Sequence, residues 1–388
     1  MKIGIVNMFY YPTFGGVEVV MQELAERYVK QGHEVHVFCC DSDKYKRIKQ
    51  KYEIHNGVHI HRSRYWFRLS LSTFIWPGLI LQLRKHKLDI VHSHVSGHLY
   101  ILLTGIMARL KKIPHIHTTH CPWTDAFRPW ILKPFLFFND KILNKLSFNL
   151  CTKIIAITPW EIPILTKWTS EDKIKVLPNG MDNILFKKVK NNKFKIKYGL
   201  KGKLVLYFGR LNPTKGPDKL AQAAVELLKT EKNLCFAFVG PDEGMMDKVK
   251  EIVKNQPQIK VTGSIRGKDK VAQMFQAAEV YVLPSYREGL PLTLFEAYAS
   301  GLPVIASPVN GIPYELKEGI NGFLVNYGDI EGLKKKIIEV LNNKKLANQF
   351  KKNNLKKAKN FTWDHIAKET FEEYKKLTDQ LLISTRIF

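Results

Sequence analysis

The sequence predicts an α/β protein with two domains, each built around a parallel sheet. The chain of 388 residues is too long for one ordinary hydrophobic core. Short apolar segments rich in β-branched residues alternate with helical patterns along the chain, as in parallel sheets whose strands are joined by crossover helices. A turn-rich segment from Pro178 to Asp182, followed by the polar, Lys-rich segment 187–203, separates two successive sets of these elements.

The strands are predicted from short apolar runs bounded by turn residues, a pattern typical of buried strands. In the first set the predicted strands are 2–7, 34–40, 58–62, 89–92, 115–118, 153–157 and 174–177. In the second set they are 203–208, 234–239, 259–262, 280–283, 303–306 and 322–325. Helices are predicted at 330–344 and 345–358, and a long amphipathic helix runs from about Trp363 to Leu382. The predicted domains are therefore 1–182 and 183–362, followed by a C-terminal helix over 363–388.

The composition limits the classes of protein to consider. There are 61 Lys and Arg residues against 35 Asp and Glu, so the formal net charge is +26. This charge favours an anionic partner: nucleic acid, an acidic membrane surface or a phosphorylated substrate. No apolar run is long enough to span a bilayer, and the first residues predict a strand rather than a signal peptide. Five Cys residues without C-x-x-C spacing indicate a reducing, cytoplasmic environment and no disulfide framework.

The most informative motif is the segment from Pro284 to Ala297, which sets Glu288 and Glu296 eight positions apart. It follows a predicted buried strand, so Glu288 is expected in the loop at the carboxyl end of that strand, where open α/β sheets bind ligands. Pro291 suits the first turn of a helix that ends near Gly301, and Glu296 lies just inside it. Two acids and free backbone N–H groups in one loop suit a polyhydroxylated, phosphorylated ligand. Two surface glutamates on a helix are the plain alternative.

A second loop, Gly209 to Gly216, follows the first strand of the second domain and precedes a helix predicted from Pro217. Arg210 offers a rigid fork for phosphate oxygens, and Lys215 offers a point charge. These two cations and the helix start would stabilise a departing diphosphate more in the transition state than in the ground state. An ordinary basic loop is the alternative.

Gly15 and Gly16 follow the first strand and open the first helix, so the backbone can approach a ligand closely there. A tight turn explains them equally well. The sequence contains neither a G-x-G-x-x-G fingerprint at this place nor a Walker A motif.

These motifs together resemble those of glycosyltransferase family 4, the retaining enzymes with the GT-B fold and an E-x7-E motif. The resemblance covers nearly the whole chain and is strongest at 203–216 and 280–325. It implies two Rossmann-like, doubly wound domains that face a central cleft, and a terminal helix that crosses back to the first domain. It also implies an acceptor bound mainly by the first domain and a nucleotide diphosphate sugar bound by the second.

The resemblance also implies roles for particular residues. Glu296 would hold the ribose hydroxyls, Glu288 and the amides after it would contact the donor sugar, and Arg210 and Lys215 would bind the diphosphate. The donor-binding residues carried over are Gly15, Gly16, Arg210, Lys215, Ile265, Glu288, Gly289, Leu290, Pro291 and Glu296. The catalytic residues carried over are His120, Arg210, Lys215 and Glu288.

Two other clusters raise the question of a metal. His92, His94, His98, His115, His117 and His120 gather near the ends of two strands, but metal-ligand spacing is missing. Only His120 has a functional counterpart in the family, near the donor sugar. His92, His94, His115 and His117 are expected to pack or form hydrogen bonds. Asp41 and Asp43 have the D-x-D spacing of metal-dependent glycosyltransferases, but a solvated loop is the favoured interpretation. We therefore expect no metal and no cofactor in the reaction.

Basic and aromatic residues alternate from Arg62 to Trp76, which fits a contact with lipid headgroups, stacking on nucleic-acid bases, or a loop flanking the core. The segment 135–150 is expected to be a core-facing helix, with Phe135, Phe138, Ile142 and Leu146 inward.

The sequence therefore predicts a hexosyltransferase that works with retention and without metal. Its expected partners are a nucleotide diphosphate sugar, a lipid or lipid-linked acceptor, and an anionic surface at the cytoplasmic membrane face. Nucleic acid is not an expected partner, because no RRM, KH or helix-turn-helix signature occurs. The alternatives are a basic, non-catalytic α/β protein that binds nucleic acid, and a GT-B nucleotide-sugar epimerase.

Overall fold

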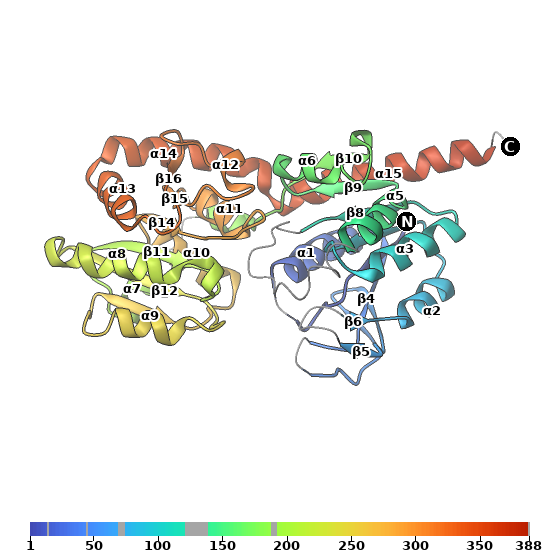
Figure 1. Ribbon diagram of the computed structural model, residues 1–388, viewed down its shortest axis with the longest axis horizontal. Coiled ribbons are helices and arrows are strands. Elements are labelled where there is room, and N and C mark those ends of the chain that lie inside the picture. The colour runs from blue at the N-terminus through green and yellow to red at the C-terminus, as the bar shows by residue number, and fades with distance from the viewer. Residues whose placement is uncertain (14, 44–45, 69–73, 121–138, 188–191, 387–388) are drawn as a thin grey trace. The chain divides into compact units, whose positions relative to one another are not determined.

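A computed structural model describes residues 1–13, 15–43, 46–68, 74–120, 139–187 and 192–386. The chain divides into two units (Figure 1). Unit 1 comprises Met1–Asn179 together with Trp363–Phe388, and unit 2 comprises Gly180–Thr362. No helix in the described ranges is long and apolar enough to cross a membrane.

Unit 1 is built on an eight-stranded sheet with the order β10-β9-β8-β7-β1-β2-β4-β3. Its strands are β1 (Lys2–Val6), β2 (Glu34–Cys40), β3 (Tyr52–His55), β4 (Val58–Ser63), β7 (Ile90–His94), β8 (His115–Thr118), β9 (Lys153–Ala156) and β10 (Ile174–Val176). All neighbours are parallel except β3, which pairs antiparallel with β4 at the edge. The short strands β5 (Phe67–Arg68) and β6 (Phe74–Ile75) form a separate ribbon.

Helices cover both faces of this sheet (Figure 1). On one face lie α1 (Gly16–Lys30) and the terminal helix α15 (Trp363–Arg386), whose Phe371 and Tyr374 pack on Tyr28 of α1. The opposite face carries α2 (Gly78–Lys85), α3 (Leu99–Leu110) and α5 (Asn144–Asn149). The remaining α-helix described in unit 1 is the short α6 (Ile162–Leu165). Successive side chains of a strand point to opposite faces, so Phe38 and Val91 form a core with Leu79 of α2 and Ile101 of α3.

Unit 2 has a fully parallel six-stranded sheet with the order β13-β12-β11-β14-β15-β16. The strands are β11 (Lys203–Phe208), β12 (Leu234–Val239), β13 (Ile259–Thr262), β14 (Val280–Leu283), β15 (Val304–Ala306) and β16 (Gly322–Leu324). The helices are α7 (Asn192–Tyr198), α8 (Pro217–Thr230), α9 (Met246–Ile252), α10 (Lys268–Gln276), α11 (Leu292–Ala299), α12 (Ile312–Glu315), α13 (Ile330–Asn342) and α14 (Lys344–Ala358). This parallel, doubly wound pattern is the predicted fold class.

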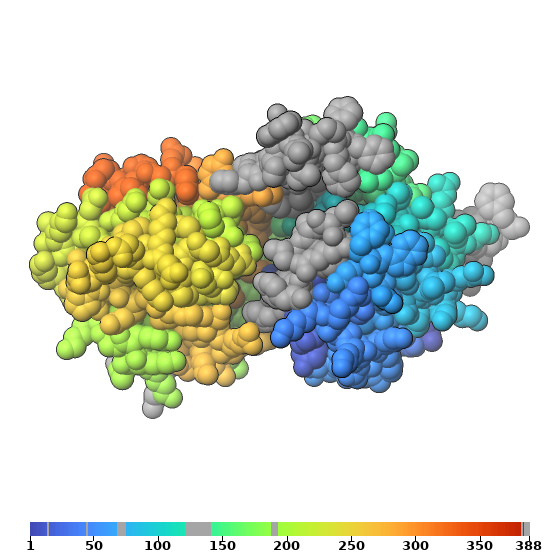
Figure 2. Space-filling model, turned by 60° about the horizontal axis from the view of Figure 1, so that its bottom comes forward, coloured from blue at the N-terminus to red at the C-terminus, as the bar shows by residue number. Residues whose placement is uncertain are grey.

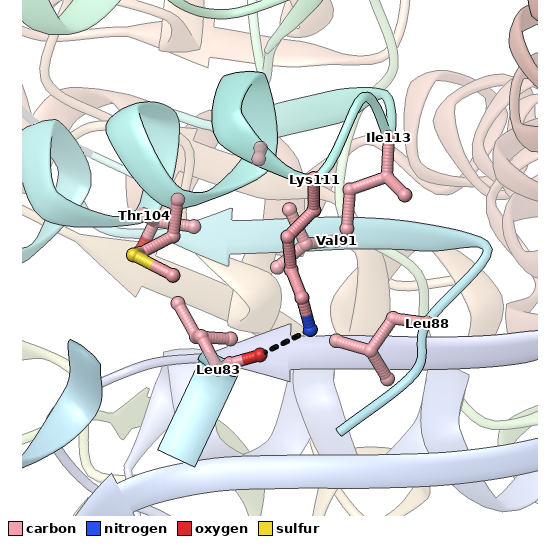
Figure 3. Close-up of a pocket in the computed structure, with 8 residues that line it drawn as sticks. Leu83, Leu88, Val91, Thr104, Lys111 and Ile113 are labelled. Carbon is pink, nitrogen blue, oxygen red and sulfur yellow. Dashed lines mark hydrogen bonds between the residues drawn. The ribbon is translucent and has the colours of Figure 1, made fainter. Parts of the chain in front are cut away.

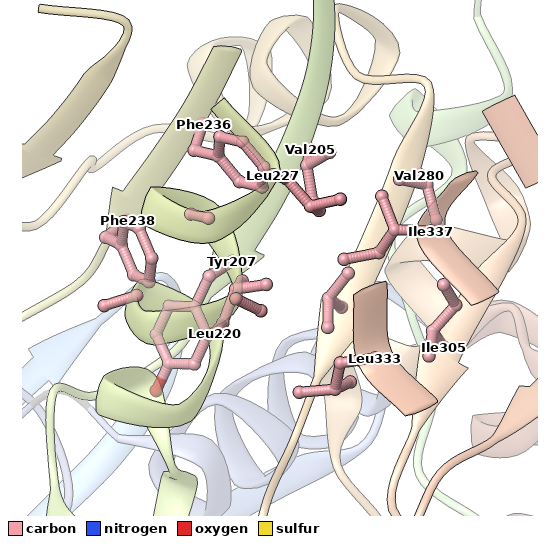
Figure 4. Packing of buried hydrophobic residues seen from close by; sticks show 14 of the residues in the cluster. Val205, Tyr207, Leu220, Leu227, Phe236, Phe238, Val280, Ile305, Leu333 and Ile337 are labelled. Carbon is pink, nitrogen blue, oxygen red and sulfur yellow. The ribbon is translucent and has the colours of Figure 1, made fainter. Parts of the chain in front are cut away.

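The main core of unit 2 lies between the sheet and helices α8 and α13 (Figure 4). Tyr207 and Phe238 from neighbouring strands pack with Leu220 of α8, and Ile337 of α13 closes the cluster over β14 and β15. On the other face, Phe275 of α10 makes edge contacts with rings from β11 and β14. A strand buried on both faces must be apolar throughout, which explains the continuous apolar runs in the sequence.

The predicted strands are confirmed, with ends that differ by no more than about two residues. The prediction missed β3 and the ribbon of β5 and β6, which are exposed or very short. The Lys-rich segment 187–203 also contains a helix, α7, within its described part.

The expectation for segment 135–150 is wrong where the structure describes it. Ile142 and Leu146 are 44% and 49% exposed, whereas α5 buries Asn144, Ser147 and Phe148. Ile142 and Leu146 share one face of the helix by their spacing, but that face points to solvent. Phe135 and Phe138 lie outside the described residues.

Candidate active site

The strand order of unit 2 marks one place in the sheet where a ligand is expected. From β11 the chain adds β12 and β13 on one side, and then β14 starts on the other side. The loops that follow β11 and β14 therefore diverge at a topological switch point, where open α/β sheets bind ligands. These are the two loops that carry Arg210, Lys215, Glu288 and the start of the Glu296 helix.

The loop after β11 ends in a short 3₁₀ turn, Pro213–Lys215, before α8 begins. The Oδ1 atom of Asn212 caps this turn by accepting a hydrogen bond from the backbone N–H of Thr214 at 2.9 Å. Gly216 then adopts φ +63°, and a Cβ atom there would lie 2.1 Å from the carbonyl oxygen of Pro284. Only glycine fits this approach, because the neighbouring atom is backbone that cannot give way.

Backbone hydrogen bonds hold the two loops together. The N–H groups of Tyr286 and Arg287 both donate to the carbonyl oxygen of Thr214, at 2.8 and 3.2 Å. Together with the close approach at Gly216, these bonds fix the loop after β14 against the loop after β11. The geometry of both motifs is thus set by backbone contacts before any ligand is present.

Lys215 and Glu288 meet across these loops. The Nζ atom of Lys215 lies 2.5 Å from Oε2 of Glu288, and the two side chains are 15% and 5% exposed. The hydroxyl of Ser285 donates to the other carboxylate oxygen at 2.7 Å, and the side-chain amide of Asn310 donates to the Glu288 carbonyl oxygen. Because the Lys215–Glu288 ion pair is buried and Glu288 accepts a further hydrogen bond from Ser285, the pair is held in one geometry. An exposed ion pair would be less constrained.

Glu296 lies on α11, and its surroundings shift the pKa of its carboxyl group strongly. Burial and, to a smaller extent, the negative charge of Asp182 together raise the pKa of Glu296 to about 7. Asp182 is itself held by Lys268 at 2.5 Å. Sequence reasoning treated Asp182 only as part of a linker turn, because nothing in the linear pattern brings residue 182 to the helix that carries Glu296. A carboxyl group with so strongly raised a pKa, on the helix that follows a candidate binding loop, is a candidate functional group.

Arg210 lies at the end of β11 in a more open environment. Its side chain is 54% exposed, and its Nη1 atom lies 2.9 and 3.1 Å from the carboxylate oxygens of Glu243. The hydroxyl of Tyr207 donates to the Arg210 carbonyl oxygen at 2.8 Å, so the backbone is fixed while the guanidinium group can change partners. Glu243 was not predicted from the sequence.

The remaining predicted donor residues occupy loops or helix starts. Gly289 is partly exposed, Leu290 is buried, and Pro291 is the N-cap of α11 rather than a residue of its first turn. Ile265 lies partly exposed in the loop between β13 and α10.

In unit 1, Gly15 is the N-cap residue of α1 and Gly16 begins that helix, after β1. The φ of Gly15 is −169°, an extended conformation open to any residue, so its backbone angle does not require glycine.

His120 stands just beyond β8 with φ +47°, an uncommon conformation for a residue other than glycine. Its Nε2 atom is 3.2 Å from Nδ1 of His94, and burial lowers the pKa of His120 to about 3. The imidazole is therefore neutral at pH 7 and can donate or accept a hydrogen bond without carrying charge.

The other histidines form the expected hydrogen-bonded network. His92 bonds to Tyr374 of α15 at 2.6 Å and to Thr118 at 2.7 Å, and the Ser93 hydroxyl bonds to both His115 and His117 at 2.8 Å. These contacts satisfy buried polar groups within unit 1, whereas Nε2 of His94 and Nδ1 of His98 have no hydrogen-bond partner among the described residues.

Asp41 and Asp43 are engaged within their own loop. Arg47 donates to both carboxylate oxygens of Asp41, at 2.7 and 2.9 Å, and Asp43 accepts from the backbone N–H of Lys46 at 2.6 Å. This arrangement favours a loop-closing role for the two acids.

In the basic and aromatic segment from Arg62 to Trp76, some of the described side chains are exposed and others are buried. Arg62 is 1% exposed and pairs with Glu53, and Trp76 is 2% exposed with its Nε1–H donating to Ser63 at 2.7 Å. The expectation that these two residues form a contact surface is wrong, because both are core residues. Trp66 and Phe67 are exposed, at 70% and 53%.

Comparison with known proteins agrees with this geometry. Residues 188–357 match the family described as Glycosyl transferases group 1, and residues 14–183 match Glycosyltransferase Family 4. The chain is 33% identical over 277 residues to the UDP-Gal:alpha-D-GlcNAc-diphosphoundecaprenol alpha-1,3-galactosyltransferase of Escherichia coli, covering 68% of this chain and 69% of that protein. It is 26% identical to alpha-monoglucosyldiacylglycerol synthase of Acholeplasma laidlawii over 98% of each chain.

Solved structures share the fold. The crystal structure of Anabaena Alr3699/HepE in complex with UDP-glucose superposes with a TM-score of 0.77 at 19% identity, over 97% of this chain and 100% of that one. Sucrose-phosphate synthase from Thermosynechococcus elongatus superposes with a TM-score of 0.75 at 21% identity, over 98% and 99%. Neither the nucleic-acid-binding alternative nor the epimerase alternative finds support in these matches.

Proposed function

The chain belongs to the glycosyltransferases of family 4 and has the GT-B fold, and on that basis we propose that it transfers a hexose from a nucleotide diphosphate sugar. The acceptor in this proposal is a lipid or lipid-linked glycan, and the anomeric configuration is retained. The observation that carries the proposal is the buried Lys215–Glu288 pair at the switch point between β11 and β14.

The donor diphosphate lies, in this proposal, against Lys215 and the start of α8. The Lys215 ammonium group keeps Glu288 as a partner, and its remaining N–H groups are directed at phosphate oxygens. As the glycosidic bond breaks, negative charge grows on the leaving diphosphate. A cation fixed beforehand stabilises that charge without reorganising, which lowers the barrier rather than only tightening binding.

Arg210 binds the diphosphate, in this proposal, by releasing Glu243 and pairing with a phosphate group instead. Its pair with Glu243 is exposed, and exposed ion pairs contribute only about 0–1 kcal/mol. A phosphate group can therefore replace Glu243 at small cost and gain a two-point contact with the guanidinium group. Glu243 holds the side chain near the loop until the donor arrives.

Glu296 binds the ribose through its carboxylate, which can accept two hydroxyl protons. Glu288 and the backbone N–H groups of Gly289 and Leu290 contact the sugar, and Ile265 lies along the base. His120, neutral at pH 7, contacts the sugar by a hydrogen bond. His120→Ala is therefore expected to lower the transfer rate while leaving nucleotide affinity unchanged, and a normal rate in that variant would remove His120 from the site.

No metal is needed in this proposal, because Lys215 and Arg210 supply the positive charge that a metal supplies in other enzymes. Glu296 sits at the ribose, so the two glutamates do not form a nucleophile and acid pair at one anomeric carbon. Retention follows from family membership and not from the spacing of the carboxylates.

Several features support a lipid acceptor. The net charge is +26, and the relatives named above include enzymes whose names specify a diphosphoundecaprenol-linked substrate and a monoglucosyldiacylglycerol product. In unit 1, Trp66 and Leu81 are 70% and 60% exposed beside Arg64 and Lys85, and they line a surface hollow of about 500 Å³. Part of the blue surface of unit 1, the colour of the early part of the chain, is exposed on the face seen in Figure 2.

We propose that the surface formed by Arg64, Trp66, Leu81 and Lys85 docks on an anionic membrane, at the cytoplasmic face of that membrane. Each Lys or Arg near such a surface contributes about 1 kcal/mol, and the apolar side chains can enter the headgroup layer. The described cysteines Cys39, Cys40, Cys151 and Cys235 are free thiols, which suits a reducing compartment.

Thermal shift with nucleotides, followed by a transfer assay, tests the proposal. UDP and UDP-sugars are expected to raise the melting temperature of the wild type by mass action, more than nucleosides without a diphosphate. Release of the nucleotide should then require both a UDP-sugar and a lipid acceptor. Absence of any nucleotide-dependent shift, with no transfer to polyprenol diphosphate or diacylglycerol acceptors, would contradict the proposed function.

A further inference from the structure

Three histidine side chains from different elements of unit 1 meet in one cluster. His36 lies on β2, His61 lies on β4, and His86 is the C-cap residue of α2. One ring nitrogen from each residue lies within 4.8 Å of the other two. The Nδ1 atom of His36 is 3.0 Å from Nε2 of His61, and the rings of His61 and His86 have centroids 4.3 Å apart.

The sheet register creates this cluster. Strands β2 and β4 are parallel, with His36 opposite His59 and Phe38 opposite His61, so these side chains project from the same face. Helix α2 packs on that face and ends at His86. His36 lies near the amino end of β2 and His61 lies in the middle of β4, whereas the predicted ligand-binding loops of this unit follow the carboxyl ends of strands. The transfer chemistry proposed above therefore leaves these histidines without a role.

Hydrogen bonds around the cluster fix which ring nitrogens carry protons. The carboxylate of Glu34, itself paired with Lys2 at 2.9 Å, accepts from Nε2 of His36 at 2.9 Å. The carbonyl oxygen of Gln82 can only accept, so Nδ1 of His86, at 2.8 Å, carries the proton. Nδ1 of His36 and Nε2 of His86 are left with lone pairs, and Nδ1 of His36 accepts from Nε2 of His61 at 3.0 Å. Metal binding through Nε2 of His61 therefore requires the His61 proton to move to its Nδ1 atom. Carboxylate or carbonyl acceptors behind the imidazole are the usual outer partners of metal-bound histidines.

The end of α2 before His86 is also anchored, and Figure 3 shows the contact between Lys111 and Leu83. The ammonium group of Lys111, just beyond α3, donates to the carbonyl oxygen of Leu83 at 2.6 Å and to that of His86. Both carbonyls belong to the end of α2, where unpaired carbonyl groups gather. The third ligand position is thus fixed from behind by packing and hydrogen bonds, as a built site requires.

We propose that His36, His61 and His86 bind a divalent transition-metal ion of the zinc class, with water as the fourth ligand. In a tetrahedral site with metal–nitrogen distances of about 2.0–2.1 Å, the ligand nitrogens lie about 3.3 Å apart. The His36–His61 separation of 3.0 Å is close to this value, and a small ring rotation brings His86 into range. Imidazole ligands favour Zn²⁺, Ni²⁺ or Cu²⁺ over Mg²⁺, which prefers oxygen.

The bound ion would cross-link β2, β4 and the end of α2 through its three histidine ligands, and would so stabilise unit 1. The neighbouring His59 is not needed as a ligand, because its Nδ1 atom bonds to the Tyr52 hydroxyl at 2.8 Å. The ion takes no part in glycosyl transfer, so this site stands or falls independently of the proposed function.

Zinc titration of the whole 388-residue chain, without a tag and after chelator treatment, tests the site. Competition with a chromophoric chelator should give a single tight zinc site per chain, and ZnCl₂ should raise the melting temperature. His61→Asn and His86→Asn should each weaken zinc binding at least about tenfold, and Glu34→Gln should weaken it by about tenfold through its partner His36. His55→Asn is the matched control, because His55 stacks on Tyr11 and lies outside the cluster.

Equal zinc affinity in the wild type, His61→Asn and His86→Asn would overturn the proposal, as would an equal loss in His55→Asn. Cobalt substitution of the wild type gives a readout that does not depend on how the variants fold. Tetrahedral binding through imidazoles predicts visible absorption bands from Co²⁺, and their absence would also overturn the proposal.

Discussion

Replacing Glu296 by Gln should stabilise the ligand-free protein at high pH and weaken nucleotide binding at the same time. The folded-state pKa of about 7 lies above the ordinary value of 4.5, so the folded protein holds this proton more tightly than the unfolded chain does. The resulting stability is fully present below the unfolded pKa and is lost as pH rises through about 7. At pH 8 the ionised carboxylate therefore destabilises the fold, and the neutral amide of Gln removes that cost.

The size of the effect follows from the pKa. A rise from 4.5 to about 7 corresponds to about 3 kcal/mol at full ionisation, since each tenfold change in proton affinity is worth about 1.4 kcal/mol. Glu296 is partly accessible to solvent, so screening reduces the expected gain in unfolding free energy to about 1–2 kcal/mol at pH 8. At pH 5 the side chain is protonated in the folded protein, and most of the difference in stability between the two proteins should be gone. Nucleotide affinity should fall roughly 5- to 150-fold, the effect of losing about 1–3 kcal/mol.

Urea unfolding of the wild type and Glu296→Gln at pH 5 and pH 8 measures the first effect, and calorimetric titration with UDP at pH 8 measures the second. Each measurement tests a different claim, so one claim can be refuted while the other stands. A variant no more stable than the wild type at pH 8 would refute the assigned electrostatics of Glu296. Unchanged UDP affinity in the stabilised variant would refute the ribose contact.

The remaining predictions concern the diphosphate, the metal and the membrane. Arg210→Ala should lower turnover by roughly 10²-fold, as loss of a fixed electrostatic donor does, and a near-normal rate would exclude it from the site. EDTA should leave transfer at 25 °C intact. If activity is instead lost and returns with Mg²⁺ or Mn²⁺, then Asp41 and Asp43 form a catalytic metal site after all. Trp66→Ser should reduce sedimentation with anionic liposomes, and docking by the wild type should weaken as salt rises because exposed charges are screened beyond about 8 Å. Equal sedimentation with neutral and anionic liposomes would contradict the docking surface.

Most of the sheet architecture could be predicted from the sequence, for a physical reason. Strands buried on both faces must be apolar along their whole length, as in 203–208 and 280–283, and such runs are visible without knowledge of their neighbours. The edge strand β3 escaped prediction because it is half exposed and its pattern mixes charged and apolar residues. The amphipathic face of 142–146 was assigned inward, although spacing alone cannot say which face of a helix meets the core.

The motifs of the candidate site could be predicted from the sequence, but the residues that contact them in the fold could not. The spacing of Glu288 and Glu296 and the loop with Lys215 are local patterns in the sequence. The Lys215–Glu288 contact joins residues 73 positions apart, and it depends on two loops that only the sheet order brings together. The same holds for Asp182 beside Glu296 and for the histidine cluster, which arises from strand register.

The most direct test of the central claim, that a nucleotide sugar is bound and cleaved at the β11–β14 switch point, compares Lys215→Ala with Lys219→Ala. Both variants remove one lysine from the same region, but Lys219 lies 3.6 Å from Asp218 and has no contact with Glu288. UDP release from UDP-glucose and UDP-galactose in the presence of lipid acceptor is measured for both. The account predicts a loss of roughly 10²-fold or more in Lys215→Ala and near-wild-type release in Lys219→Ala. Near-wild-type release in Lys215→Ala, or equal losses in both variants, would contradict it.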